Sequence, residues 1–200
     1  MSRTVLCLTA AAVALSLAAC NKPAANPPSA VTPAEQAATP DAHPAATIPT
    51  PSNEAAAPDF VAKASASDML EVQAAKIALD RSKNADVKAF AKMMQSAHTQ
   101  TTKALKAAIA ASGAAVTPAA ALPDDLQAKI NELLKVDSAD FDKTYLGQQV
   151  DAHQAALDLM QRYAKDGDVA QIKAFAAKVA PAVQEHLTKA KAIKDALAKA

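Results

Sequence analysis

Residues 113–138, GAAVTPAAALPDDLQAKINELLKVDS, decide the fold of this chain. Two prolines, Pro118 and Pro123, break helical structure in the first half, because proline lacks an N–H donor and its ring clashes with the preceding turn. The second half, residues 124–136, predicts a short helix. A connection of this length can traverse a helical bundle, whereas the helices of a plain up-down bundle are joined by short loops.

Long segments with helical periodicity lie on both sides of this crossover. Helices are predicted at 59–82 and 84–111 before it, and two more follow from residue 138, separated by the tight turn at Asp166-Gly167. Each tight turn predicts an antiparallel pair of helices. The order of helices and connections therefore predicts an all-α, ferritin-like four-helix bundle over residues 59–200, with a short helix in the crossover between helices two and three.

Polar residues at the helix starts predict the N-terminal caps, because Asp, Asn and Ser accept hydrogen bonds from the free N–H groups of a first helical turn. The predicted caps are Asp59, Asn84, Ser138 and Asp168, and Gly113 is predicted to close the second helix. Composition agrees with helix, since the 51% hydrophobic content is mostly alanine and the chain has only three glycines.

The N-terminal sequence predicts a lipoprotein. Arg3 gives a positive start, and the apolar run at 5–17 is too short to span a bilayer. The stretch Leu17-Ala18-Ala19-Cys20 then has the bacterial lipobox pattern, in which the peptidase cuts before a cysteine whose thiol carries a lipid. We therefore expect a signal peptide at 1–19 and a lipidated Cys20. Asn21, in place of Asp, indicates export to the outer membrane, with the protein facing the periplasm.

Residues 20–58 predict the lipidated cysteine followed by a disordered tether. Residues 21–58 hold nine of the twelve prolines and few large apolar side chains, which is typical of a flexible linker. His43 lies in this tether and is expected to be a solvated bystander. Stable membrane attachment is expected through the lipid alone.

Charge and cysteine content exclude several function classes. Removing residues 1–19 takes away one base, Arg3, and no acid, so the mature chain carries 20 basic and 20 acidic residues. This balance does not favour nucleic acid or anionic lipid as a partner, and no protein partner is indicated. Cys7 lies in the signal peptide and Cys20 is used by the lipid, so the bundle has no thiol for a disulfide, a thiolate metal site or cysteine catalysis.

Polar residues interrupt the apolar face of each long helix. These residues are Glu71, His98, His153 and His186, one on each helix. A buried carboxylate must be paired, bound to a metal or neutral, because burying it alone costs several kcal/mol. One carboxylate and three imidazoles form a ligand set for a single divalent ion, with zinc, copper or iron as the candidates. The alternative is a buried hydrogen-bond network that fixes the helix pairing.

Axial positions along the helices test whether these residues can meet. Glu71 and His98 lie about 12 and 14 residues from the first turn, which places them within about 3 Å of each other along the bundle axis. His153 and His186 lie about 13 and 19 residues from the second turn, which predicts a mismatch of about 9 Å. A helix kink or an offset between the helix pairs is needed to bring His186 to the other three.

Other chemistry is weakly indicated. A di-iron site requires Glu-x-x-His motifs, but Gln95 and Val183 precede His98 and His186 by three residues. Tyr145, near the start of the third long helix, is expected to pack in the core, with a helix end or a pocket as alternative positions.

Three blocks of sequence resemble a known family. They are Ala89-Phe90-Ala91-Lys92-Met93-Met94 leading to His98-Thr99, then Phe141-Asp142 with Tyr145, Gln149-Val150 and His153, then Phe175-Ala176, Pro181 and Glu185-His186-Leu187. Together they resemble the bacterial domain-of-unknown-function family four-one-four-two over about residues 58–198. That family carries an acidic residue directly before the histidine of the second helix, where this chain has Ala97. The resemblance implies a ferritin-like bundle in an envelope protein and recurrent polar positions at Glu71, His98, His153 and His186, but it implies no activity.

These observations predict a lipid-anchored envelope protein, non-enzymatic, whose bundle core carries a Glu/His polar cluster as a candidate site for one divalent metal. Two other functions remain open. One is a metal-dependent redox or hydrolytic enzyme with an open coordination position, and the other is a structural or stress-related envelope module that binds a partner through a helix face.

Overall fold

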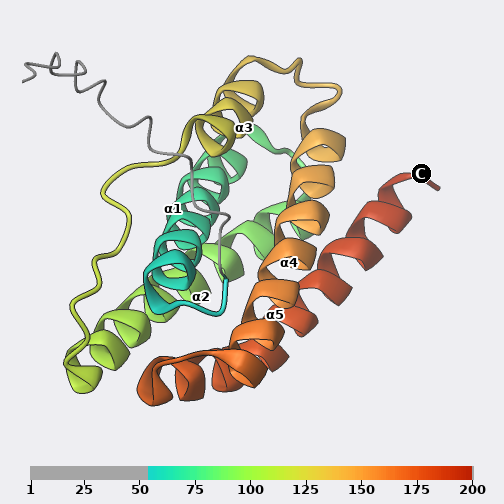
Figure 1. Ribbon diagram of the computed structural model, residues 1–200. Helices are drawn as coiled ribbons and strands as arrows, with labels where there is room; N and C mark the ends of the chain where they lie inside the picture. Colours follow the sequence, from blue (N-terminus) through green and yellow to red (C-terminus); the bar gives the residue numbers. More distant parts are fainter. Residues whose placement is uncertain (1–53, 200) are drawn as a thin grey trace, which may run out of the picture. The chain divides into compact units, whose positions relative to one another are not determined.

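The computed structural model describes residues 54–199, so the predicted signal peptide, Cys20 and nearly all of the tether lie outside the described residues. The described chain is all-α and contains no strand. Its helices are α1 (Ala57–Arg81), α2 (Ala85–Ser112), α3 (Asp124–Lys135), α4 (Phe141–Asp166) and α5 (Ala170–Leu197) (Figure 1). The all-α helical bundle and the short helix in the crossover, both predicted from the sequence, are therefore confirmed.

The four long helices pack in the cyclic order α1, α2, α5, α4. Helix α1 contacts α2 and α4, and α5 contacts the same two helices, so α1 and α5 lie on opposite sides of the bundle. The crossover carries the chain back to the end of α1, where Arg81 donates hydrogen bonds to the carbonyls of Leu133 and Val136 around α3. Helix α4 therefore starts beside the end of α1 and runs antiparallel to it.

The predicted cap at the second helix is confirmed. The Asn84 side chain accepts hydrogen bonds from the N–H groups of Asp86 and Val87, at 2.9 and 3.1 Å. Gly113 ends α2 with a φ of 66°, a left-handed conformation that glycine adopts without strain. Local sequence therefore determines both ends of α2.

Two other predicted caps are wrong. Helix α1 begins at Ala57 rather than after Asp59, because a proline in the first helical turn, here Pro58, loses no helical hydrogen bond. Ser138 does not cap α4. Residues 138–140 form a turn in which the N–H of Asp140 donates to the carbonyl of Asp137, and α4 begins only at Phe141.

Asp168 caps a different helix from the one predicted. The residue before α5 is Val169, which makes no side-chain cap. Asp168 Oδ1 instead accepts a hydrogen bond from the N–H of Ala57 at 2.9 Å and another from the hydroxyl of Tyr163 at 2.9 Å. This carboxylate therefore joins the start of α1 to the turn between α4 and α5, an arrangement that sequence proximity does not reveal.

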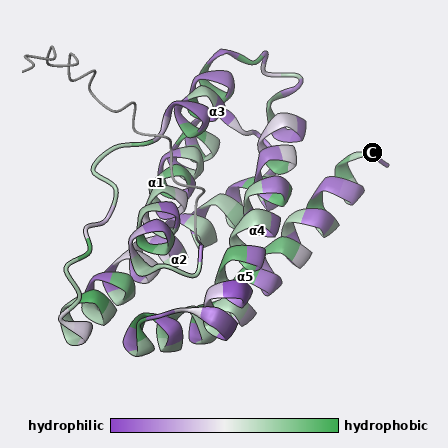
Figure 2. Cartoon of the chain, in the orientation of Figure 1, coloured by the Kyte–Doolittle hydropathy of each residue, from purple (hydrophilic) through white to green (hydrophobic). Residues whose placement is uncertain are grey.

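Two apolar clusters form the two ends of the core. One includes Ala74, Phe90, Met94, Leu133, Phe141 and Leu146, and the other includes Phe60, Leu105, Met160, Tyr163, Ile172 and Phe175. Apolar and polar residues alternate along every long helix, as expected for helices with one buried face (Figure 2). Buried polar residues separate the two clusters, so the candidate site lies midway along the bundle.

None of the helices within residues 54–199 combines the length and the apolar character needed to cross a membrane.

Candidate metal centre

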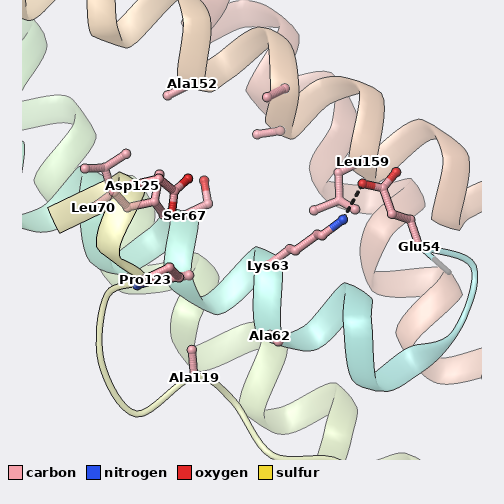
Figure 3. A pocket seen from close by; sticks show the side chains of 14 residues that line it. Glu54, Ala62, Lys63, Ser67, Leu70, Ala119, Pro123, Asp125, Ala152 and Leu159 are labelled. Atoms are coloured by element: carbon pink, nitrogen blue, oxygen red, sulfur yellow. Dashed lines mark hydrogen bonds and ion pairs between the residues drawn. The ribbon is translucent and has the colours of Figure 1, made fainter. Parts of the chain in front are cut away.

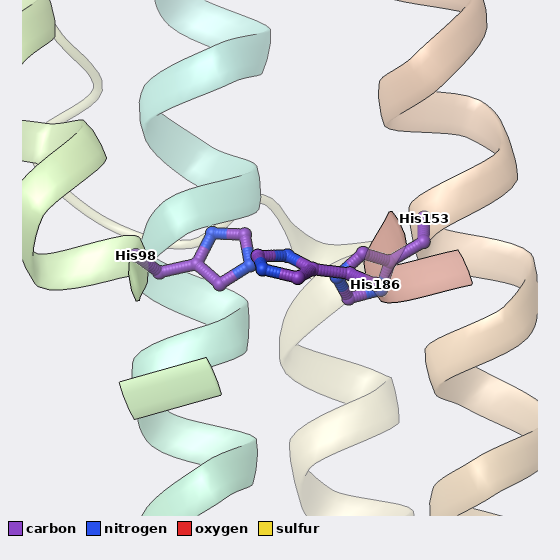
Figure 4. A group of neighbouring side chains, drawn as sticks. All are labelled: His98, His153 and His186. Carbon is purple, nitrogen blue, oxygen red and sulfur yellow. The ribbon is translucent and has the colours of Figure 1, made fainter. Parts of the chain in front are cut away.

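Three histidines from three helices meet in the middle of the bundle. His98 comes from α2, His153 from α4 and His186 from α5, and we refer to them as the histidine cluster (Figure 4). Their ring centroids lie 5.5–5.8 Å apart. One nitrogen from each ring lies within 4.8 Å of the other two. His98 and His153 are buried and His186 is partly buried.

Hydrogen bonds fix the orientation of two of the rings. His98 Nδ1 lies 2.8 Å from Asp68 Oδ1, and His153 Nδ1 lies 2.8 Å from the carbonyl oxygen of Gln149. A carbonyl oxygen and a carboxylate only accept, so Nδ1 donates in both pairs. A neutral ring then has its lone pair on Nε2, the nitrogen that remains available to a metal.

The remaining ring nitrogens have no protein partner. In the described part of the chain, Nε2 of His98, Nε2 of His153 and Nδ1 of His186 are buried and accept or donate no hydrogen bond. An unpaired buried polar atom costs about 1–3 kcal/mol. Three of them at one place indicate a site built for a ligand that satisfies them together.

Asp68 is a site residue that the sequence analysis did not identify. It is 4% exposed, and its second oxygen accepts a hydrogen bond from Thr102 Oγ1 at 3.0 Å. A signal was present, because Asp68 and Glu71 are three residues apart and share one face of α1. Asp68 therefore supports His98 from behind, on the side of α1.

Glu71 lies beside the histidine cluster and does not belong to the group of converging donors. It is 1% exposed, and its Oε2 accepts a hydrogen bond from Gln149 Nε2 at 2.7 Å. Its Oε1 lies 3.9 Å from His153 Nδ1 and has no hydrogen bond to any described residue. The carboxylate that contacts His98 is Asp68, and Glu71 lies as a neighbour of His153.

Burial lowers the proton affinity of two of the three histidines. Burial lowers the pKa of His153, and the positive charge of His98 lowers it further, whereas the negative charge of Glu71 raises it. Burial also lowers the pKa of His186 to about 4, assisted by the positive charges of His153, His98 and Lys189. Both rings are therefore neutral at pH 7 and can donate lone pairs.

His98 behaves differently. Burial lowers its pKa, but the hydrogen bond to Asp68 and the negative charges of Glu71 and Asp68 outweigh this and hold the pKa above its ordinary value of 6.5. The two buried carboxylates therefore favour the protonated form of His98.

The axial mismatch of His186 is smaller than the expected value of about 9 Å. His153 lies 13 residues before the end of α4 at Asp166, and His186 lies 16 residues after the start of α5 at Ala170. Counting from the helix ends, with the connecting residues left out, reduces the mismatch to about 4.5 Å. The sequence-based count placed those connecting residues in the helix, which is why the predicted value was too large.

Tyr145 lies in the core and is not part of the histidine cluster. Its ring is fully buried and packs against Phe141 and Phe90, with centroids at 6.2 and 6.4 Å. Burial, together with the negative charge of Glu71, raises the pKa of Tyr145. Its hydroxyl has no hydrogen-bond partner among residues 54–199. The side chain therefore packs in the core, as expected.

A separate pocket of about 450 Å³ lies between α1, the crossover and α4 (Figure 3). Its walls are mostly alanine and leucine side chains, and the ion pair between Lys63 Nζ and Glu54 Oε1, at 2.6 Å, lies at one end. None of the three histidines lines it. The pocket therefore offers an apolar surface and no group of metal ligands.

Comparison with known proteins identifies the family. The family described as a domain of unknown function (DUF4142) matches residues 41–193. The chain belongs to this family. The match confirms the resemblance seen in the three sequence blocks and covers all three histidines of the cluster. The chain matches no curated protein and no solved structure. The description of DUF4142 names no activity, so the family alone does not indicate what the site does.

Proposed function

We propose that the bundle binds one divalent metal ion through His98 Nε2, His153 Nε2 and His186 Nδ1. The observation that carries this proposal is the convergence of three histidine rings, each of which has one buried nitrogen without a hydrogen-bond partner. Metal–nitrogen bonds of about 2.0–2.1 Å in a tetrahedral site place the nitrogens about 3.4 Å apart. Because one nitrogen of each ring already lies within 4.8 Å of one nitrogen of each of the other two, these nitrogens have to approach by no more than about 1.4 Å.

The surrounding residues favour a cation over a purely structural network. A hydrogen-bond network does exist, since Asp68 binds His98 and Glu71 binds Gln149. That network leaves the three ring nitrogens unsatisfied, and a metal would satisfy all of them. The carboxylates of Asp68 and Glu71 would offset the charge of a divalent ion in the core. Asp68 would also hold the His98 imidazole in place, as carboxylates behind metal-binding histidines commonly do.

The donor chemistry favours zinc, copper or iron, because imidazole nitrogen suits all three. Three protein ligands leave at least one coordination position for water or another ligand. The simplest function is non-enzymatic metal binding in the cell envelope. A redox or hydrolytic reaction at the open position is the second candidate, and the three-ligand geometry is the observation that favours it.

The cellular setting of this function is also part of the proposal. The lipobox at Leu17–Cys20 supports a protein anchored by lipid in the outer membrane and facing the periplasm. Cys20→Ala should abolish labelling by a palmitate analogue and leave the precursor uncleaved. Equal labelling of wild type and variant would exclude the anchor.

Metal analysis tests the proposed site. Full-length protein purified from its native envelope should contain about one equivalent of zinc, copper or iron, and a chelator should lower its melting temperature, since a ligand that binds only the folded state stabilises it. His98→Ala and His153→Ala should remove the metal. His43→Ala, which changes the one histidine outside the cluster, should retain it.

The hydrogen-bond network predicts a different result. His98→Ala would then destabilise the bundle by about 1–3 kcal/mol without any dependence on metal. A wild-type melting temperature that neither chelator nor added zinc, copper or iron changes would exclude the metal site.

A further inference from the structure

A surface groove between α2 and α5 leads to one of the three histidines. Its lining includes Met93 from α2 and Gln184, Glu185, His186, Thr188 and Lys189 from α5. His98 and His153 do not line it and are buried. Ligands from solvent can therefore approach the histidine cluster along the side of His186.

Lys189 lies at this groove and close to His186. It follows His186 by three residues, so the two side chains are neighbours on one face of α5. Its Nζ lies 3.8 Å from Met93 Sδ, so the ammonium group reaches across the groove from α5 to α2. The carboxylate of Glu185 lines the same groove. Lys189 thus places a positive charge beside His186 on the groove side.

The negative charges of the site lie on the opposite side. Asp68 and Glu71 both come from α1, and α1 is diagonally across the bundle from α5. A metal held by the histidine cluster would therefore have the carboxylates of Asp68 and Glu71 on its α1 side and the ammonium group of Lys189 on its groove side. This polarity favours a negatively charged ligand on the groove side.

We infer, building on the proposed metal site, that the fourth coordination position faces the α2/α5 groove and takes an exchangeable small anion, with Lys189 assisting its binding. Three neutral imidazoles leave the full charge of the metal available to this ligand. In the exchange the metal–oxygen bond to a bound water breaks and a bond from the metal to the anion forms. No electron is transferred and no other bond changes. The ligand class includes hydroxide, azide and small carboxylates.

Cobalt provides the probe, because four-coordinate Co²⁺ absorbs visible light and the absorption reports a change of ligand. Full-length protein saturated with Co²⁺ should show a change in absorption that saturates as azide is added. Lys189→Gln should weaken azide binding by about three- to tenfold, the range expected for loss of one partly solvated charge near the ligand. Lys191→Gln, on the same helix but outside the groove, should leave azide binding unchanged.

The possible results separate this inference from the metal site itself. If Co²⁺ binds but azide leaves the absorption unchanged, the exchangeable position is wrong and the metal site stands. If Co²⁺ does not bind, both are wrong. If Lys189→Gln and Lys191→Gln behave alike, the assignment of Lys189 is wrong.

Discussion

Replacing Asp68 by alanine tests how the site holds His98. Asp68 Oδ1 lies 2.8 Å from His98 Nδ1, and Oδ2 accepts a hydrogen bond from Thr102 Oγ1 at 3.0 Å. Thr102 keeps a second acceptor after the substitution, the carbonyl of His98 at 2.9 Å. His98 Nδ1 has no second acceptor among residues 54–199. The loss of stability on substitution therefore comes mainly from the lost hydrogen bond of His98.

The size of the effect follows from this geometry. A hydrogen bond to a charged group contributes about 1.5–3 kcal/mol, so the metal-free variant should lose stability by about that amount. Its metal affinity should fall by about 10- to 100-fold, because the ring is no longer held in the binding orientation.

The loss of stability should also depend on pH. The folded-state pKa of His98 lies above 6.5, so this ring contributes stability that is fully present below 6.5 and is lost as the pH rises through the folded-state pKa. The difference between wild type and Asp68→Ala should therefore be larger below pH 6.5 than well above it.

Urea unfolding of the metal-free proteins measures the stability, and competition with a chelator measures the metal affinity. Asp80→Ala is the matched control, because Asp80 lies on the same helix and is exposed. Its stability should stay within about 0.5 kcal/mol of wild type. If Asp68→Ala and Asp80→Ala agree in both measurements, the support of His98 by Asp68 is refuted.

Three further predictions concern stability. The metal-free protein should lose stability as pH falls from 6.5 toward about 4, because burial lowers the pKa of His186 to about 4 and the unfolded chain therefore takes up a proton first. In His186→Gln, stability followed by circular dichroism should depend less steeply on acid pH, and a dependence as steep as that of wild type would contradict this. Asp168→Ala should lower the free energy of unfolding in urea by about 1–2 kcal/mol, because the first N–H of α1 and the Tyr163 hydroxyl lose their acceptor. A decrease of less than about 0.5 kcal/mol would contradict the role of Asp168 as this acceptor. Gly167→Ala should lower the melting temperature, because a Cβ there would lie 2.5 Å from the Tyr163 carbonyl oxygen. Gly147→Ala, whose Cβ meets open space within α4, should keep or raise the melting temperature. A melting temperature of Gly167→Ala above that of Gly147→Ala would contradict the packing of this turn.

Periodicity predicted the bundle and the helix faces that carry the three histidines, but it did not predict that His186 meets the other two. A helical period of 3.6 residues places His98, His153 and His186 on the buried faces of their helices, and the lengths of the connections predict which helices pair. The same reasoning identified Glu71 as buried, because burial depends on the helix face alone. It could not determine which donor Glu71 contacts, since rotation about the side-chain bonds is not encoded in the helix period.

The remaining features depend on contacts between distant parts of the chain. Asp168 caps α1, which lies 111 residues away in the sequence, because packing brings the turn after α4 beside Ala57. Local rules assign a cap to the nearest helix and so predicted the wrong one. Asp68 was missed for a different reason, since the buried face of α1 is broad enough to include both Asp68 and Glu71 and is wider than a single helical stripe predicts.

The most direct test of the central claim is a crystal structure of the full-length protein with zinc, recorded at the zinc absorption edge. The account predicts one anomalous peak in the middle of the bundle, about 2.0–2.1 Å from His98 Nε2, His153 Nε2 and His186 Nδ1. No peak at saturating zinc, or a peak bound by fewer than two of these histidines, would contradict it.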